Sequence, residues 1–174
     1  MSAAIQINSN GAEQAHSMTT RLQAGQQELI ERIQRAARTN GSVEALPGLF
    51  LNRAATPGEP LLSLYDPMFC VIAQGSKEVL LNNERYRYDA ANYLIVTANL
   101  PVVAHVVEAS KTQPYLSLSL KLDPLLVSQV MVEAGQTALP QRASVRALNV
   151  SPLEPELLEA VVRLVRLADD PGEA

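Results

Sequence analysis

The chain offers few side chains that could perform catalysis or bind a metal ion. Its 174 residues include two histidines, His16 and His105, and one cysteine, Cys70. Metal sites in β-barrels use several histidines and a carboxylate that converge from neighbouring strands. His16 lies in a polar N-terminal segment and His105 in the apolar run VVAHVVEA. The sequence therefore predicts no metal site, no cofactor and no catalytic residues.

The other potentially reactive groups indicate the same conclusion. Cys70 lies in an apolar segment, where a lone cysteine is usually a buried small hydrophobic residue, and it has no partner for an intramolecular disulfide. The chain contains no glycine-rich phosphate-binding loop, and its carboxylates are scattered rather than paired on strands. We predict that the chain is not an enzyme.

A candidate ligand-binding surface comes instead from residues 77–88. Two strand-like segments there flank Asn82-Asn83, and asparagine tolerates the positive φ that a two-residue hairpin turn requires. Folding at this pair places Glu78 opposite Arg87, so that opposite charges pair across the strands. One face of the hairpin then carries Lys77, Val79, Leu81, Tyr86 and Tyr88.

Tyrosine combines apolar area with one hydroxyl group, which suits a small polar ligand. The candidate ligand-binding residues are Lys77, Val79, Tyr86 and Tyr88 on this face, followed by Tyr93 and His105. Two interpretations stay open. The side chains line a lumen in which Lys77 reaches toward an anionic or polar ligand, or they fill the core and Lys77 extends to the rim.

The elements that must position these residues are short strands. Strand-like segments follow one another at near-regular spacing from Met68 to Pro124, as in a small antiparallel β-barrel or sandwich. Residues 115–122 (YLSLSLKL) alternate without a fault, so their leucines face a core. Their polar side, with Tyr115 and Ser117, faces either solvent or a lumen.

Helical patterns flank the strands. Residues 21–38 have an amphipathic pattern that Thr19 or Thr20 can cap, and their apolar stripe packs on the barrel or on another subunit. Residues 125–135 have helical spacing, and residues 151–154 (SPLE) have the capping-box pattern that begins a further helix. The apolar band of that last helix comprises Leu157, Leu158, Val161, Val162, Leu164 and Val165.

Composition limits the possible partners. The formal net charge is −4, whereas a domain that binds nucleic acid by itself usually carries a positive patch. The N-terminal segment lacks a basic start followed by an apolar run, and no apolar stretch approaches about 20 residues. We therefore expect no DNA binding by this chain itself, no membrane association and a cytoplasmic location.

Several short motifs lie among the predicted strands. They are Gln74-Gly75-x-Lys77, Tyr86-x-Tyr88-Asp89, Tyr93-Leu94, Leu100-Pro101, and Pro114-Tyr115-Leu116 with Leu118. Together they resemble the N-terminal domain of AraC-type transcriptional regulators, over roughly residues 40–170. The sequence departs from the family pattern in two turns, at Asn82-Asn83, where a glycine is commoner, and at Ala90-Ala91, where a proline is commoner.

The resemblance implies a cupin-like β-barrel that senses a small effector, followed by helices that form a homodimer through the apolar band of the last helix. In this family a helix-turn-helix domain of about 100 residues normally follows. DNA would thus be bound only through a domain that is absent from this chain. We expect a mainly β fold with flanking helices, namely a cupin-like antiparallel β-barrel or jelly roll plus C-terminal helices.

The expected organisation is a flexible arm at residues 1–20, an N-terminal helix at 21–40, a β-barrel effector domain at 41–124 and a helical dimerisation segment at 125–174. The predicted function is small-molecule sensing and dimerisation that control an attached DNA-binding domain. Two alternatives remain. One is a stand-alone cupin-type metabolite enzyme, which would need a metal, and the other is an interaction domain with a filled barrel and no effector.

Overall fold

The computed structural model describes residues 4–135 and 146–169 of the chain. Its strands are β1 (Gly41–Leu46), β2 (Leu49–Ala54), β3 (Leu61–Tyr65), β4 (Met68–Gln74), β5 (Ser76–Leu81), β6 (Glu84–Asp89), β7 (Asn92–Val96), β8 (Leu100–Glu108), β9 (Tyr115–Lys121) and β10 (Leu148–Pro152). Its helices are α1 (Ala4–Ala36), α2 (Pro124–Glu133) and α3 (Pro155–Asp169).

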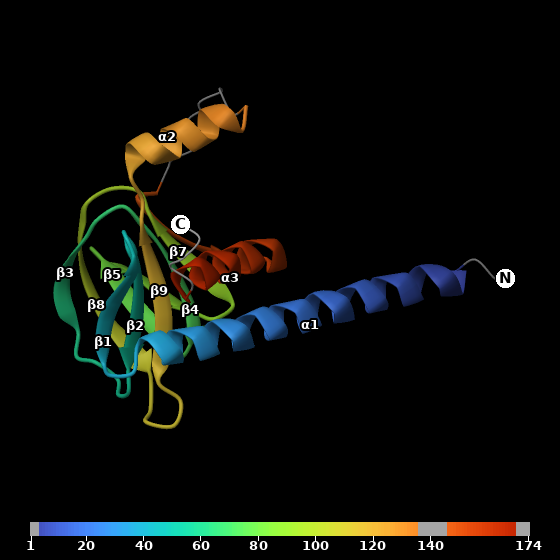
Figure 1. The fold of residues 1–174 in the computed structure, drawn as a ribbon, viewed down its shortest axis with the longest axis horizontal. Helices are drawn as coiled ribbons and strands as arrows, with labels where there is room; N and C mark the ends of the chain where they lie inside the picture. Colours follow the sequence, from blue (N-terminus) through green and yellow to red (C-terminus); the bar gives the residue numbers. More distant parts are fainter. Residues whose placement is uncertain (1–3, 136–145, 170–174) are drawn as a thin grey trace.

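The strands form two antiparallel sheets that pack face to face. One has six strands in the order β1-β2-β9-β4-β7-β10, and the other has four in the order β3-β8-β5-β6. Figure 1 shows α1 and α3 together beside these sheets, while α2 projects away from them. This architecture confirms the predicted fold class, a mainly β, cupin-like fold with flanking helices.

The β5–β6 hairpin has the predicted register. Glu78 pairs with Arg87, Val79 pairs with Tyr86, and Asn82 adopts a φ of 54° in the turn. Asparagine accepts this left-handed conformation more readily than most residues, so the turn forms without the commoner glycine.

Two hydrophobic cores lie on opposite faces of the six-stranded sheet. The inner core fills the space between the sheets and includes Val79, Leu94 and Val102. The outer core lies under α1 and α3 and includes Leu116 and Leu118 of β9. The leucines of β9 therefore face a core, as predicted, and strand alternation turns the polar side of β9 toward the other sheet.

The helix α1 is longer than the sequence predicted. It begins at Ala4 rather than near residue 21, so residues 4–20 of the expected flexible arm are helical, and it ends at Ala36. Thr19 does not cap the helix, because its hydroxyl donates a hydrogen bond to the carbonyl of Ala15, one turn earlier. Of the two predicted partners for the apolar stripe, the chain's own barrel is the one observed, since Leu29 and Ile33 are fully buried in the outer core.

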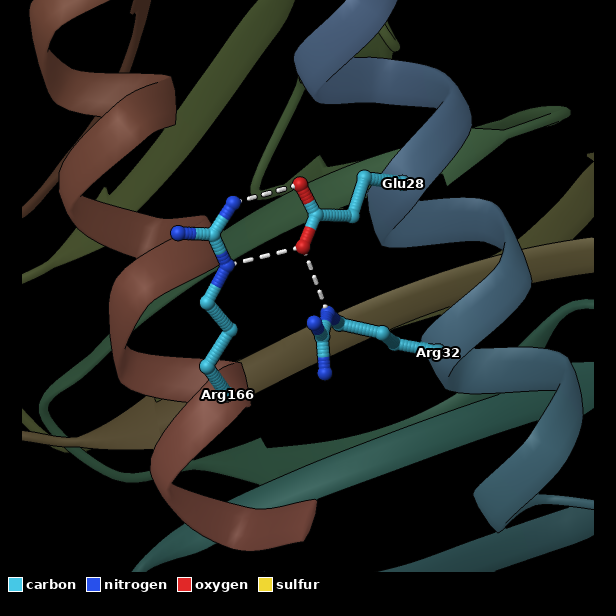
Figure 2. A network of polar contacts seen from close by, with 3 residues as sticks. All are labelled: Glu28, Arg32 and Arg166. Atoms are coloured by element: carbon cyan, nitrogen blue, oxygen red, sulfur yellow. Dashed lines mark hydrogen bonds and ion pairs between the residues drawn. The ribbon is translucent and has the colours of Figure 1, made fainter. Parts of the chain in front are cut away.

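Charged side chains join α1 to α3 at the edge of the outer core (Figure 2). Glu28 of α1 accepts two hydrogen bonds from Arg166 of α3, at 2.8 and 2.7 Å, and one from Arg32 at 2.8 Å. The hydrogen bonds from Arg166 are the main reason that the pKa of Glu28 is lowered to about 2. A second contact, from Arg21 to Glu159 at 3.0 Å, joins the same two helices.

Two strands and one helix boundary differ from the sequence expectation. The strand β1 was not predicted, and β10 lies inside the expected helical segment 125–174. Residues 151–152, expected to open the last helix, instead pair with β7, and α3 begins at Pro155. Pairing with β7 at the edge of the six-stranded sheet is a tertiary contact, and here it outweighs the local helix-start pattern.

The helix α2 confirms the predicted helix at residues 125–135 but is fully exposed. The Asp123 side chain accepts a hydrogen bond from the Leu125 amide at 2.8 Å and so caps its start, and Gly135 follows its end with a φ of 72°. None of the residues in α2 is buried. In the part of the chain that the structure describes, no helix has the length and hydropathy that crossing a membrane requires.

Candidate functional site

A cavity of about 330 Å³ lies between the two sheets. Strands of both sheets contribute to its wall. The lining residues are Asn52, Arg53, Ala54, Tyr65, Met68, Cys70, Lys77, Tyr88, Val106, Tyr115, Ser117, Leu118 and Ser119. The side chains of Arg53 and Leu118 share a strand face with residues of the outer core, so these two border the cavity through their backbone.

Lys77 is placed in the cavity by the start of β5. Gly75 precedes the strand with a φ of 85°, and a Cβ there would lie 2.3 Å from the carbonyl oxygen of Glu108, so only glycine fits. Two residues later Lys77 lies between Tyr88 of β6 and Val106 of β8 as cross-strand neighbours on one face. The Gly-x-Lys spacing thus fixes the position of the lysine.

The Lys77 ammonium lies against aromatic groups. Its Nζ is 5.4 Å from the centroid of the Tyr65 ring, within the range of a cation–π contact. Burial lowers the pKa of Lys77, but the nearby Tyr115 and Tyr65 hydroxyls raise the pKa more, so the side chain is positively charged at neutral pH. The Tyr65 hydroxyl lies close enough to Lys77 to raise the pKa of the lysine, but the two groups do not have the geometry of a hydrogen bond.

Tyr65 presents a buried hydroxyl group with no hydrogen-bond partner among the described residues. Its side chain is buried at the end of β3, and the oxygen itself is sealed from solvent. Buried polar groups in folded proteins are almost always hydrogen-bonded, so an exception indicates a missing partner or a functional role.

The other polar groups of the cavity are neutral. Burial raises the pKa of the Cys70 thiol to about 11 and raises the pKa of Tyr88 and of Tyr115 above their ordinary value. Cys70 is therefore an unreactive buried thiol, as predicted. On the opposite wall, the Asn52 amide donates to the Ser117 hydroxyl at 3.3 Å.

The structure brings together only part of the predicted site. Lys77 and Tyr88 line the cavity, and Val79 lies beside them, fully buried in the inner core. Tyr86 is at the rim of the hairpin, where its hydroxyl donates to Glu84.

Two predicted site residues lie elsewhere. Tyr93 packs against Phe69 on the helix-covered face of the six-stranded sheet, with ring centroids 5.4 Å apart. His105 pairs with Glu78 on the face of β8 opposite to Val106, because side chains alternate along a strand. Neither lines the cavity.

Tyr65, Tyr115 and Ser117 complete the site but were not predicted as binding residues. Tyr115 and Ser117 could have been found, because the faultless alternation of residues 115–122 left a lumen-facing side as one of two options. Tyr65 gives no such signal, because it ends a short strand and meets Lys77 only through tertiary packing.

The apolar band of the last helix is occupied within the chain. Leu158, Val161, Val162 and Val165 are buried in the outer core, with Leu157 and Leu164 packed beside them. The expectation that this band is free to form a dimer interface is therefore corrected. The reason is the apolar stripe of α1 between Leu22 and Ala36, which packs against α3 within the same chain.

A second hollow of about 790 Å³ lies at the surface beside α1. Two of its three glutamine side chains are already used, because Gln26 donates to the Ala90 carbonyl at 2.6 Å and Gln74 donates to the Pro114 carbonyl at 2.7 Å. Among the described residues, no group of three or more histidine, cysteine, aspartate or glutamate side chains lies together in a way that could hold a metal ion. The cavity between the sheets is the better candidate site.

Comparisons with known proteins match residues 45–174 to the family model described as the AraC-type transcriptional regulator N-terminus. No curated protein matches the sequence. The structure is similar to that of ToxT from Vibrio cholerae O395 bound to (E)-4-(8-methylnaphthalen-1-yl)but-3-enoic acid, with a TM-score of 0.52 and 13% identity over 71% of this chain and 49% of that chain.

A 1.65 Å structure of ToxT from Vibrio cholerae gives a TM-score of 0.50 and 13% identity, over 67% of this chain and 46% of that chain. At such identities the likeness concerns the fold. The chain spans about half the length of the solved structures that it matches.

Proposed function

Because the chain belongs to the family of AraC-type transcriptional regulators, whose N-terminal domain matches residues 45–174, we propose that it senses a small-molecule effector in the cavity between its sheets. Occupancy of the cavity controls an attached helix-turn-helix domain, through which alone the protein contacts DNA. The domain performs no catalysis and acts in the cytoplasm.

The polar lining of the cavity is the observation that carries this proposal. Its volume of about 330 Å³ is within the usual range for ligand pockets, about 300–1,000 Å³. Lys77, Tyr65 and Ser117 contribute polar side chains to its lining from three different strands. A barrel filled only for packing would place apolar side chains there, so the lining supports a sensor over an interaction domain without an effector.

The solved ToxT structure with a bound butenoic acid derivative is consistent with this function, since a small molecule occupies a protein of the same fold. For this chain, effector binding and its coupling to DNA binding are parts of the proposal. The coupling requires that the effector stabilise one of two arrangements of the attached domain.

Thermal denaturation of the purified chain with a library of small metabolites tests the proposal. At least one compound should raise the melting temperature, because a ligand that binds only the folded state stabilises it. Ser117→Leu places a larger side chain in the cavity and should abolish the rise in melting temperature. Ser42→Leu, at an exposed position on β1, should preserve that rise. A rise that survives Ser117→Leu would place the ligand elsewhere, and about one bound transition metal per chain would favour the enzyme alternative.

We propose further that the chain forms a homodimer through α2. Residues 124–132 (PLLVSQVMV) carry no charged side chain, so two copies can pack without repulsion. Leu125, Leu126 and Val130 are exposed by 76, 59 and 55%. A helix with so many exposed apolar side chains is normally covered, and a second copy of α2 is the partner that we propose. The barrel domain at 41–124 would then dimerise through the segment 125–174.

Sedimentation of the chain at high micromolar concentration tests the dimer. The double variant Leu126→Glu/Val130→Glu should be a monomer with an intact fold. Leu62→Glu, which adds charge at another exposed leucine, on β3, should remain a dimer. A monomeric native chain would contradict the proposal, and a dimer that survives the double variant would place the interface elsewhere.

A further inference from the structure

The cavity holds a positive charge that nothing around it balances. Among the described residues that line the cavity, none is an aspartate or a glutamate. Lys77 makes no ion pair with any described residue. A cation removed from water without a partner is costly, so proteins usually pair such groups.

The acidic groups near Lys77 do not act as counter-ions. The thiol of Cys70 and the phenols of Tyr88 and Tyr115 have raised pKa values because they are buried, so each is neutral at neutral pH. The cation–π contact with Tyr65 offsets part of the cost but supplies no negative charge. Lys77 therefore has no negatively charged partner among the described residues.

The Tyr65 hydroxyl lacks a partner at the same place. It is buried and donates to no described atom, and its ring lies beside the Lys77 ammonium. A carboxylate oxygen accepts hydrogen bonds from both an ammonium and a hydroxyl. One anionic group could satisfy two unpaired donors at once when the Tyr65 hydroxyl, which the unliganded fold seals from solvent, turns toward the cavity.

The rest of the wall limits the kind of anion. Lys77 is the single cation whose side chain faces the cavity among the described lining residues, since strand alternation turns Arg53 to the other face. This favours one negative charge over the two of a phosphate. Ala54, Met68 and Val106 provide apolar wall, and the volume is at the lower end for ligand pockets.

We propose that the effector is a small organic carboxylate whose single negative charge contacts the Lys77 ammonium and accepts a hydrogen bond from the Tyr65 hydroxyl. The inference rests on the proposed sensing function and names the class of molecule that it serves. The apolar part of the acid lies along Met68 and Val106.

Calorimetric titration with matched acids and amides tests this inference. The probes are benzoate, hexanoate and 3-phenylpropanoate, each compared with its primary amide. At least one acid should bind about tenfold or more tightly than its amide, because a hydrogen bond to a charged group is stronger than one to a neutral group. Lys77→Met should remove this advantage, so that each acid binds no more tightly than its amide.

A matched control is available on the surface. Lys121 lies 5.5 Å from the Phe50 ring centroid, in the same kind of contact as Lys77 with Tyr65, but it is exposed. Lys121→Met should leave acid binding intact. Tyr65→Phe should weaken acid binding several-fold, and it serves as the second test if Lys77→Met does not fold.

The outcomes separate the two proposals. Acids that bind no better than amides, or equally well to Lys77→Met, would overturn the carboxylate inference but leave a sensor of neutral molecules. Failure of every acid to bind at millimolar concentration would overturn it as well. The sensing function is then judged by the metabolite library and the Ser117→Leu variant, which do not depend on charge.

Discussion

The Tyr65 hydroxyl destabilises the unliganded fold. A buried polar group without a partner loses its hydration, at about 1–3 kcal/mol, and the Tyr65 oxygen has no partner among the described residues. We expect Tyr65→Phe to raise the free energy of unfolding of the unliganded chain by about 1 kcal/mol. Urea denaturation at neutral pH measures the change.

Tyr115→Phe provides the control for that variant. Its hydroxyl lies in the same cavity but interacts with Ser117, so its removal should lower the free energy of unfolding. A loss of stability in Tyr65→Phe would show that water or another group already satisfies the hydroxyl. A gain in stability together with weaker acid binding would indicate that the Tyr65 hydroxyl serves ligand binding and lowers the stability of the fold.

At the scale of elements, the contact between α1 and α3 depends on ionised Glu28. Hydrogen bonds from Arg166, opposed by burial and reinforced by Arg32, lower its pKa from 4.5 to about 2. A lowered carboxyl pKa stabilises the fold above about pH 4.5, and that stabilisation is lost as the pH falls toward 2. We expect the chain to lose stability in this range, as measured by urea denaturation at a series of pH values.

Glu28→Gln should remove most of the pH dependence attributed to this contact. Glu31→Gln is the matched control, because Glu31 lies on the same helix and accepts a hydrogen bond from the neutral Gln27 side chain, at 2.8 Å, rather than from an arginine of α3. An unchanged acid profile in Glu28→Gln would assign the acid sensitivity to other carboxyl groups.

The buried face of α3 makes a second prediction at this scale. Leu158 is 1% exposed and meets α1 at Gly25, where a Cβ would lie 3.1 Å from the Leu158 Cδ2. We expect Leu158→Ala to lower the free energy of unfolding by about 3 kcal/mol. Leu62→Ala, at an exposed position on β3, should change it by less than about 0.5 kcal/mol. Equal effects in denaturation experiments would contradict the assignment of α3 to the core.

At the scale of the whole molecule, α1 lies outside the residues that the family model matches. The family match begins at residue 45, whereas α1 ends at Ala36 and still supplies Leu29 and Ile33 to the outer core. The described side chains of residues 13–20 are exposed. Residues 13–20 of α1 therefore add little to the core, whereas the part of α1 around Leu29 and Ile33 belongs to it.

Truncation of α1 tests this division. A chain that starts at residue 21 should keep the melting temperature of the full chain, because the removed part contributes no buried side chain among residues 13–20. A chain that starts at residue 37 should melt at a lower temperature or aggregate, because it exposes Val161 and Val165 of α3. Equal melting temperatures for the two truncations would show that α1 does not stabilise the barrel.

The amino-acid sequence determined those features that depend on neighbouring residues. The alternation of β9, the register of the β5–β6 hairpin and the helix at residues 125–135 each follow from local spacing, and the structure confirms them. Lys77 and Tyr88 were placed in the site for the same reason, because the period of a strand decides which side chains share a face.

Only the tertiary structure decided which faces meet. Tyr65 reaches Lys77, and α1 covers α3, through contacts between segments far apart in the chain, so local periodicity does not reveal them. The strand β10 shows the same limit, since its pairing with β7 outweighs a good helix-start pattern. Tyr93 and His105 lie on strand faces that point away from the cavity, because a strand pattern shows two faces without showing which one faces the other sheet.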